Sequence, residues 1–214
     1  MSELIDATHG ISDSAVTEIV DAVRTGALVV IPTDTSYAVI CDAFHPAAIS
    51  SLRIAKNQAG NIRLPIVAGS IDTIRGVARL SVVADDLARA FWPGPLTLLT
   101  HEQPALAWNV GSPDHALAVR VPAHETAQKI LNGIGPTVMT GAQQAGGHPL
   151  LNLEHARDSL GESVAIYVDG GSLSGTTSTV IDTSSDNLRL VRSGAITLDA
   201  IRNVVPTVIN AVTV

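Results

Sequence analysis

The chain has 214 residues, 46% hydrophobic and 15% charged, a balance that excludes a disordered protein and suits one large domain. Aromatic residues make up only 3%, so we expect a core of aliphatic side chains, as in a sheet covered by helices. The formal net charge of -7 argues against a broad nucleic-acid-binding face, although a few arginines could still converge in one cleft.

Hydrophobic spacing and glycine or proline punctuation predict helices that alternate with strands along the chain. The first helix is expected over Ser14–Thr25, stopped by Gly26, and the first strand over Ala27–Ile31, stopped by Pro32. The other predicted helices are Pro46–Lys56, Ser70–Leu80, Val82–Phe91, Ala123–Asn132 (closed by Gly133), Leu153–Leu160 and Thr197–Val204. The other predicted strands are Leu64–Ala68, Pro95–Thr100, Ala116–Val121, Pro136–Thr140, Val164–Val168, Thr179–Asp182 and Leu188–Val191.

This alternation predicts an α/β fold: a twisted mixed sheet flanked by helices, built as one domain over residues 1–214. The late strands follow one another closely, so we expect part of the sheet to be antiparallel. The loose stretches Asn57–Ile62, Gly141–Pro149 and Gly170–Ser178 are too short to be domain linkers. We therefore expect them to be loops, where binding residues usually lie.

A single cysteine, Cys41, excludes an intrachain disulfide, and no Cys or His spacing indicates a tightly bound metal. No uninterrupted apolar run is long enough for a membrane span, and the first ten residues lack the basic start of a signal peptide. These features predict a cytoplasmic protein with no membrane segment.

The first candidate binding cluster is Pro32–Tyr37 (PTDTSY), directly after a buried strand. Ligands in open α/β sheets bind beyond the carboxyl ends of strands, and threonine hydroxyls with a phenol could hold a small polar ligand there. An ordinary turn explains the same residues, because Asp and Thr favour turns without any ligand.

Two cations lie at the ends of predicted elements. Lys56 ends a helix, with Arg63 seven residues later, and the pair could hold a triphosphate. Lys56 could equally do no more than satisfy the helix dipole. Arg120 ends an apolar strand, where burial requires an anionic partner, either a ligand carboxylate or an internal acid such as Asp34.

Small and polar residues follow the strand Pro136–Thr140, from Thr140 to Gly147. They would let a ligand approach backbone N–H groups, although the segment has neither Walker A nor Rossmann glycine spacing. Later in the chain, Ser178 opens one predicted strand and Arg192 closes another. This hydroxyl and this cation could point into the same cleft.

The order of these clusters resembles that of the YrdC-like threonylcarbamoyl-AMP synthase family. The shared motifs are P-T-D-T-x-Y, a helix ending in Lys, L-P-I-V, F-W-P-G-P-L-T, V-R-V-P, D-G-G, S-T-V-I-D and R-x-G-A-I, from about Ala27 to Ile196. The resemblance implies a YrdC-like α/β fold with a central cleft.

The resemblance also implies an activity: synthesis of threonylcarbamoyl-AMP from L-threonine, bicarbonate and ATP, with release of pyrophosphate. ATP would enter as its Mg²⁺ complex, and the product would pass to the tRNA-modifying proteins that make threonylcarbamoyladenosine. Some family members bind double-stranded RNA. For this acidic chain, we expect RNA binding to be weak and strongly salt-dependent.

Carried over by position, the threonine-binding residues would be Thr35, Tyr37, Arg120 and Ser178. The nucleotide-binding residues would be Lys56, Thr140, Gly141, Gln143 and Arg192. The resemblance implies no side-chain nucleophile, since positioning and charge neutralisation are sufficient for this reaction.

Five positions differ from the family's motifs, and Ala38 and Val39 are two of them, since the family usually has Gly-Leu after the tyrosine. Gln58 stands where the K-x-R motif has its second cation, and Gly141 and Gln143 stand where the S-x-N motif has Ser and Asn. Losing a cation and a polar anchor would weaken transition-state stabilisation. The alternative to an active synthase is therefore a weak or inactive paralogue that binds a nucleotide, an amino acid or double-stranded RNA in the same cleft.

Overall fold

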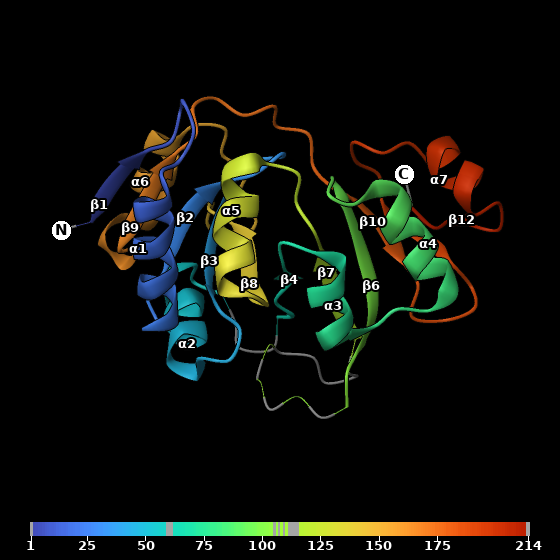
Figure 1. Ribbon diagram of the computed structural model, residues 1–214. Coiled ribbons are helices and arrows are strands. Elements are labelled where there is room, and N and C mark those ends of the chain that lie inside the picture. Colours follow the sequence, from blue (N-terminus) through green and yellow to red (C-terminus); the bar gives the residue numbers. More distant parts are fainter. Residues whose placement is uncertain are drawn as a thin grey trace.

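The computed structural model describes residues 2–58, 62–104, 106, 108, 110 and 116–212. Within these ranges, twelve strands form one mixed sheet flanked by helices (Figure 1). The strands are β1 (Glu3–Asp6), β2 (Val29–Pro32), β3 (Tyr37–Asp42), β4 (Ile66–Val67), β5 (Ala78–Arg79), β6 (Leu96–Glu102), β7 (Ala116–Arg120), β8 (Thr137–Gly141), β9 (Ile166–Asp169), β10 (Thr179–Asp182), β11 (Arg189–Arg192) and β12 (Ile209–Asn210). The helices are α1 (Asp13–Arg24), α2 (Pro46–Ala55), α3 (Ile71–Val77), α4 (Val82–Phe91), α5 (Glu125–Ile134), α6 (Leu153–Leu160), the 3-10 turn η1 (Gly161–Ser163) and α7 (Leu198–Val204).

The strand order is β1-β9-β2-β3-β8-β4-β7-β6-β10-β11-β12, and β5 pairs with β6 beside this path. Strand β9 pairs in parallel with β1 and β2, whereas β3 lies antiparallel to β2 and β8. Strand β10 is parallel to β6 and antiparallel to β11. The predicted mixed sheet, with antiparallel pairing late in the chain, is confirmed.

Side-chain caps start most helices close to where the sequence predicts them. The capping side chain accepts a hydrogen bond from the backbone N–H three residues later, which satisfies a donor that the helix leaves unpaired. The residues that cap in this way are Ser12, Ser70, Ser81, Asn152 and Thr197. The predicted bounds of α4 and α6 agree with the structure.

The predicted end of α5 is wrong. The helix expected to close at Gly133 continues to Ile134, and the left-handed position, with φ of 98°, belongs to Gly135. Gly133 has a packing role instead, because a Cβ there would lie 2.7 Å from a side-chain carbon of Val20. This glycine therefore lets α1 approach α5.

Four strands are absent from the sequence-based prediction: β1, β3, β5 and β12. Strand β5 falls inside the helix expected over Ser70–Leu80, which ends at Val77. Strand β3 matters most, since it pairs Tyr37 with Pro32 and makes the segment between them a hairpin turn. The candidate PTDTSY cluster thus joins two central strands of the sheet.

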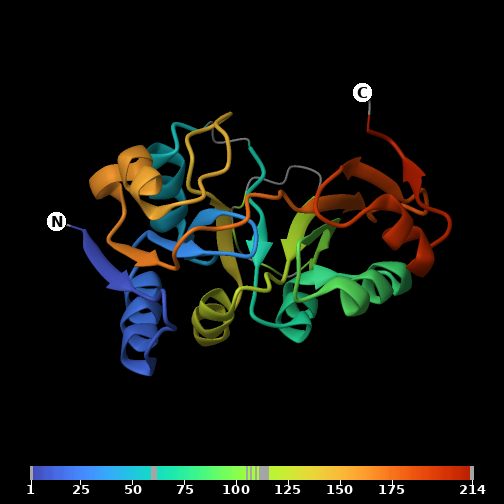
Figure 2. The same cartoon turned by 90° about the horizontal axis from the view of Figure 1, so that it is seen from above.

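Two apolar clusters cover the two faces of the sheet around β3. Val39 and Cys41 belong to one cluster, and Ala38 and Ile40 to the other, as the alternation of a strand directs. Helices α1 and α5 lie on one side of this region, and α2 and α6 lie on the other (Figure 2). Burial on both faces explains why the chain is continuously apolar along β2.

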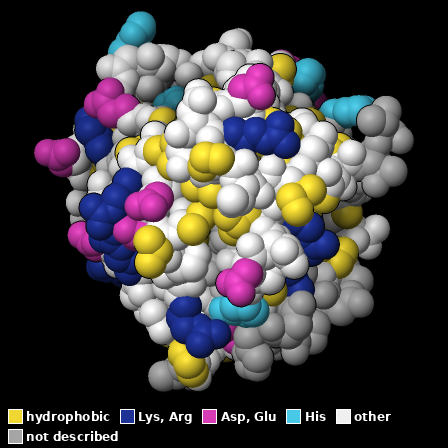
Figure 3. Space-filling view, turned by 90° about the vertical axis from the view of Figure 1, so that its right-hand side faces the viewer, with side chains coloured by type: hydrophobic (Ala, Val, Ile, Leu, Met, Phe, Trp, Pro, Cys, Tyr) yellow, Lys and Arg dark blue, Asp and Glu magenta, His cyan; other side chains and the backbone are white. Residues whose placement is uncertain are grey.

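Apolar side chains also reach the surface at the end of the molecule formed by α4, α7 and β12 (Figure 3). The exposed ones on these elements and on β11 are Val82, Val191, Val204 and Ile209. None of the helices in the described part of the chain is long and apolar enough to cross a membrane.

Candidate functional site

A cavity of about 480 Å³ opens over the middle of the sheet, where β6, β7, β8 and β10 meet the hairpin between β2 and β3. Most of the residues predicted to bind ligand lie in its wall. These are Thr35, Arg120, Thr140, Gly141, Gln143, Ser178 and Arg192. Residues spread over most of the chain thus meet in one place, although their roles toward a ligand remain predictions.

Arg120 projects from the end of β7 and is almost fully buried, with 7% of its side chain exposed. Its Nη2 donates to Asp34 Oδ1 at 2.6 Å, its Nε to the Gly94 carbonyl at 3.0 Å, and its Nη1 to Thr35 Oγ1 at 3.3 Å. Burial lowers the pKa of Arg120, while the carboxylate of Asp34 opposes that shift. The internal acid is therefore one partner of this arginine, and the cavity offers room for a second.

The corner Trp92–Pro95 helps to hold Arg120. A Cβ at Gly94 would lie 2.3 Å from the carbonyl oxygen of Phe91, so only glycine fits there. The amide of Gly94 donates to the carbonyl of Val121 at 2.8 Å, and its own carbonyl accepts from Arg120. The sequence indicates a structural role for this corner, but not that it supplies a hydrogen-bond acceptor to the site.

The hairpin turn is stabilised internally by Thr33. Its Oγ1 accepts from the backbone N–H groups of Thr35 and Ser36, both at 3.2 Å, and donates to the Ser36 carbonyl at 2.7 Å. Asp34 projects from the same turn, and its Oδ2 is buried with no hydrogen-bond partner within the described ranges. The turn and the candidate site are therefore the same structure, so the two interpretations of PTDTSY do not exclude one another.

Ser178 and Arg192 form another part of the cavity wall. Arg192 Nη2 donates to Ser178 Oγ at 2.7 Å, and Arg192 Nε donates to the Ser178 carbonyl at 3.0 Å. Ser178 Oγ also lies 3.0 Å from Thr97 Oγ1. Thr97 lines the cavity but is not among the binding residues predicted from the sequence. Alternation along β6 could have found it, because Thr97 and Leu99 face the same side.

Two positive charges face this cavity. Burial lowers the pKa of Arg192, and the positive charge of Arg120 lowers it further. The two guanidinium groups therefore repel one another across the site, and Asp34 compensates only Arg120 directly. An anion bound in the cavity would relieve this repulsion.

Gly194 places Arg192 by letting two backbones approach. A Cβ at Gly194 would lie 2.4 Å from backbone atoms of Thr177, Ser178 and Thr179. These are backbone atoms that cannot move aside as a flexible side chain can. Next to it, the amide of Ala195 donates to the Thr177 carbonyl at 2.9 Å.

We expect Gly194→Ala to lower the free energy of unfolding by about 1–3 kcal/mol, because overpacking forces the backbones apart. Urea unfolding followed by circular dichroism measures the change. The matched control is Gly76→Ala, since a Cβ at Gly76 in α3 meets no atom within 4 Å and alanine favours helices. Equal stability of the two variants would contradict the close approach at Gly194.

Lys56, the C-cap of α2, lies behind the cavity wall rather than among its lining residues. It is 3% exposed, and its Nζ donates to the carbonyls of Gly141, at 2.5 Å, and Gln143. Burial lowers the pKa of Lys56 to about 8. The structure thus makes this lysine a support for the loop after β8, a role more specific than satisfying a helix dipole.

Tyr37 is also placed behind the wall, at 0% exposure. Its hydroxyl donates to the Gly171 carbonyl at 2.7 Å and accepts from the Gly170 amide at 3.0 Å, with Asp169 Oδ1 at 3.1 Å. Burial raises the pKa of Tyr37 to about 12. The phenol of Tyr37 therefore joins β3 to the turn at residues 169–171, and it is not among the cavity-lining residues.

Gln58 and Arg63, on either side of the undescribed residues 59–61, are not among the cavity-lining residues. The prediction that Asn57–Ile62 is a loop lies partly outside the described residues. Within the described residues, no group of His, Cys, Asp and Glu side chains could hold a metal ion.

The family model for Sua5, YciO and YrdC proteins, described as telomere recombination, matches residues 21–194. The chain belongs to the Sua5/YciO/YrdC family. A Mycobacterium tuberculosis protein provisionally named threonylcarbamoyl-AMP synthase is 36% identical over 187 residues, 86% of both chains. Threonylcarbamoyl-AMP synthase from Pyrococcus abyssi is 30% identical over 86% of this chain and 55% of its own.

Solved structures of the Sua5/YciO/YrdC family confirm the predicted fold. P. abyssi Sua5 complexed with L-threonine superposes with a TM-score of 0.91 at 27% identity, over 98% of this chain. This chain spans 62% of that Sua5 chain. Escherichia coli YciO superposes with a TM-score of 0.85 at 22% identity, over 94% of this chain and all of its own, which shows the fold alone.

Proposed function

We propose that this chain is a threonylcarbamoyl-AMP synthase that uses L-threonine, bicarbonate and ATP. The observation that supports this most is the convergence of Arg120 and Arg192 on one cavity lined by hydroxyl groups. A carboxylate and a polyphosphate are the ligands that such a pair of guanidinium groups suits. Relatives named for this activity cover most of the chain.

The proposed reaction has two steps. The amine of threonine attacks bicarbonate to form a carbamate and water. A carbamate oxygen then attacks the α-phosphorus of ATP, and pyrophosphate leaves with the electrons of the broken bond. Both steps join small charged molecules, so orientation and charge neutralisation supply the catalysis.

We assign Arg120 to the carboxylate of threonine, because Asp34 and the Gly94 carbonyl already hold its guanidinium in one orientation. The hydroxyls of Thr35 and Ser178 lie beside the two arginines and complete this end of the site. A guanidinium held in advance loses little conformational entropy when it binds its ligand.

We assign Arg192 to the phosphates of ATP, which binds as its Mg²⁺ complex. Thr140, Gly141 and Gln143 form the other side of the nucleotide site, and Lys56 holds their loop from behind. Lys56 therefore contributes positive charge through the loop rather than by direct contact.

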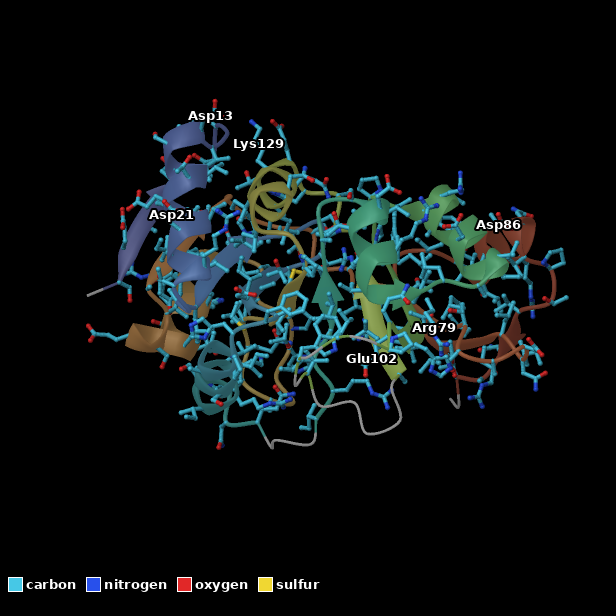
Figure 4. The ribbon with its side chains drawn as sticks, turned by 60° about the horizontal axis from the view of Figure 1, so that its bottom comes forward. Asp13, Asp21, Arg79, Asp86, Glu102 and Lys129 are labelled. Atoms are coloured by element: carbon cyan, nitrogen blue, oxygen red, sulfur yellow. The ribbon has the colours of Figure 1, made fainter. Side chains whose placement is uncertain are left out.

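We also propose that the chain binds double-stranded RNA weakly and that its product passes to tRNA-modifying proteins in the cytoplasm. Acidic residues such as Asp13, Asp21 and Asp86 lie on the outer surface of the helices (Figure 4). They would repel a nucleic-acid backbone over these faces. Binding of double-stranded RNA should therefore be weak and should fall steeply between 50 and 200 mM salt.

A product assay tests the proposed function. Purified protein receives Mg²⁺·ATP, L-threonine and bicarbonate, and mass spectrometry looks for threonylcarbamoyl-AMP while a coupled assay follows pyrophosphate. We expect product that depends on both threonine and bicarbonate. No product from folded protein, beside an active synthase as control, would favour the alternative of a paralogue that binds without turnover.

A further inference from the structure

The segment that joins β7 to α5 carries two basic side chains that interact with Asp34. Arg120 ends β7, and its Nη2 donates to Asp34 Oδ1 at 2.6 Å. His124 is the N-cap residue of α5, and the negative charge of Asp34 favours its protonated form. Asp34 thus acts on one base that is always charged and on one that can be neutral or charged.

The ring of His124 does not cap the helix that it starts. N-cap side chains normally accept a hydrogen bond from the first turn of the helix, and His45 Nδ1 does so at the start of α2, at 3.2 Å. His124 makes no such bond. A Cβ at Gly170 would lie 3.5 Å from His124 Cε1 and 2.6 Å from the ring of Pro32. The imidazole therefore lies beside the base of the hairpin turn that carries Asp34.

One polar atom of His124 and one of Asp34 are buried without a partner. Neither His124 Nδ1 nor Asp34 Oδ2 has a hydrogen bond to the described residues. Unpaired buried polar atoms destabilise a fold, and native structures rarely keep them. The imidazole nitrogen can donate, whereas the carboxylate oxygen can only accept, so the two atoms complement one another. A direct hydrogen bond or one bridging water would satisfy both.

The other carboxylates around His124 already have partners. Glu125, which also favours protonation of His124, forms an exposed ion pair within its own helix. Asp169, in the residue before Gly170, accepts a hydrogen bond from the Tyr37 hydroxyl at 3.1 Å. Of the described carboxylates near this imidazole, the one in the hairpin turn is thus the one with a buried oxygen to spare.

The net charge of Arg120, Asp34 and His124 depends on the imidazole. With a neutral imidazole the charges of Arg120 and Asp34 cancel, whereas a protonated imidazole makes the group of three positive. A carboxylate that binds Arg120 is attracted more strongly by the positive group. Burial lowers the pKa of His124, and the charge of Asp34 opposes that shift. The imidazole is therefore neutral in the free protein at pH 7 and becomes charged in mildly acidic solution.

We propose that His124 is a positioning residue that pairs with Asp34, and that its protonation and the binding of the threonine carboxylate to Arg120 promote one another. The inference rests on the proposed function. His124 is not among the cavity-lining residues, so it acts on the ligand through Asp34 and Arg120. Coupling between two binding events is reciprocal, so each must strengthen the other by the same factor.

Calorimetry of threonine binding between about pH 8 and pH 5.5 tests the effect of the proton on the ligand. The complex holds the proton more tightly than the free protein does, so the affinity for threonine should rise about five- to tenfold as the pH falls through this range. His124→Gln keeps a polar side chain that cannot be protonated, and its profile should stay flat. His155→Gln is the matched control, because His155 is exposed on α6, and this variant should follow the parent chain.

Nuclear magnetic resonance tests the effect of the ligand on the proton. The imidazole C–H signals of His124, assigned from their loss in His124→Gln, report its titration with and without threonine. With threonine bound, the proton affinity of His124 should be about five- to tenfold higher, the same factor as in calorimetry. The signals of His155 should titrate alike in both samples. The titration is measured on the parent chain, so it does not depend on the stability of a variant.

Three results would each overturn the proposal: a flat profile in the parent chain, a rise in affinity that His124→Gln retains, or a His124 titration that threonine does not move. Absence of threonine binding by the folded parent chain at every pH would instead overturn the proposed function. The two failures are distinguishable, since the first requires a parent chain that binds threonine.

Discussion

Replacement of Arg120 by glutamine is expected to raise the KM for threonine by about 30-fold or more, because removing one partner of a buried charge pair costs about 2–5 kcal/mol. The side chain is 7% exposed and donates to Asp34, Gly94 and Thr35. Steady-state kinetics with threonine as the varied substrate measures this change. The KM for ATP should change much less.

The same variant should also be less stable by about 3–5 kcal/mol, since it leaves the carboxylate of Asp34 buried without its cation. The double variant Asp34→Asn with Arg120→Gln removes both charges and should recover part of that stability. It should not recover threonine binding. Arg75→Gln is the control, because Arg75 makes surface ion pairs with Asp72 and Asp85 that contribute little. Normal threonine kinetics in folded Arg120→Gln would refute the assignment.

Lys56 should make both stability and nucleotide binding depend on pH above neutrality. Burial lowers its pKa from 10.5 to about 8, so between these values the unfolded chain holds a proton that the folded chain has lost. Stability rises with pH wherever the unfolded state binds more protons. We therefore expect the contribution of Lys56 to the free energy of unfolding to rise by about 1–3 kcal/mol from pH 8 to pH 10.5.

Nucleotide affinity should move in the opposite direction. Below pH 8, Lys56 is charged behind the loop of Gly141 and Gln143, and its charge favours bound phosphates. Above pH 8 the charge is lost, and Mg²⁺·ATP should bind more weakly.

Urea unfolding and calorimetry at pH 7 to 10 test both effects. Lys56→Met removes the titrating amine. The free energy of unfolding and the affinity for Mg²⁺·ATP of this variant should therefore change less above pH 8 than those of the parent chain. Lys129→Met is the matched control, because Lys129 is exposed and pairs with Glu125 on the surface of α5 (Figure 4). Equal pH profiles for the parent chain and Lys56→Met would show that the lysine does not titrate in this range.

The class of fold and the order of the binding motifs could be predicted from local patterns in the sequence. The bounds of α4, α6 and β10 follow from apolar spacing and from capping residues such as Ser81 and Asn152. These are signals between near neighbours in the chain, and they act before distant parts meet. The sequence also predicted that Arg120 has an anionic partner, because a buried guanidinium group requires one.

Which side chains face the cavity could not be predicted in this way, because it depends on contacts between distant parts of the chain. Lys56 reaches carbonyls 85 and 87 residues away, and Tyr37 meets the turn at Gly171, so both lie behind the wall. No local pattern encodes that choice, because it depends on how strands distant in sequence pair in the sheet. The same holds for Gly194, whose close approach is set by the space that remains once the backbone has packed.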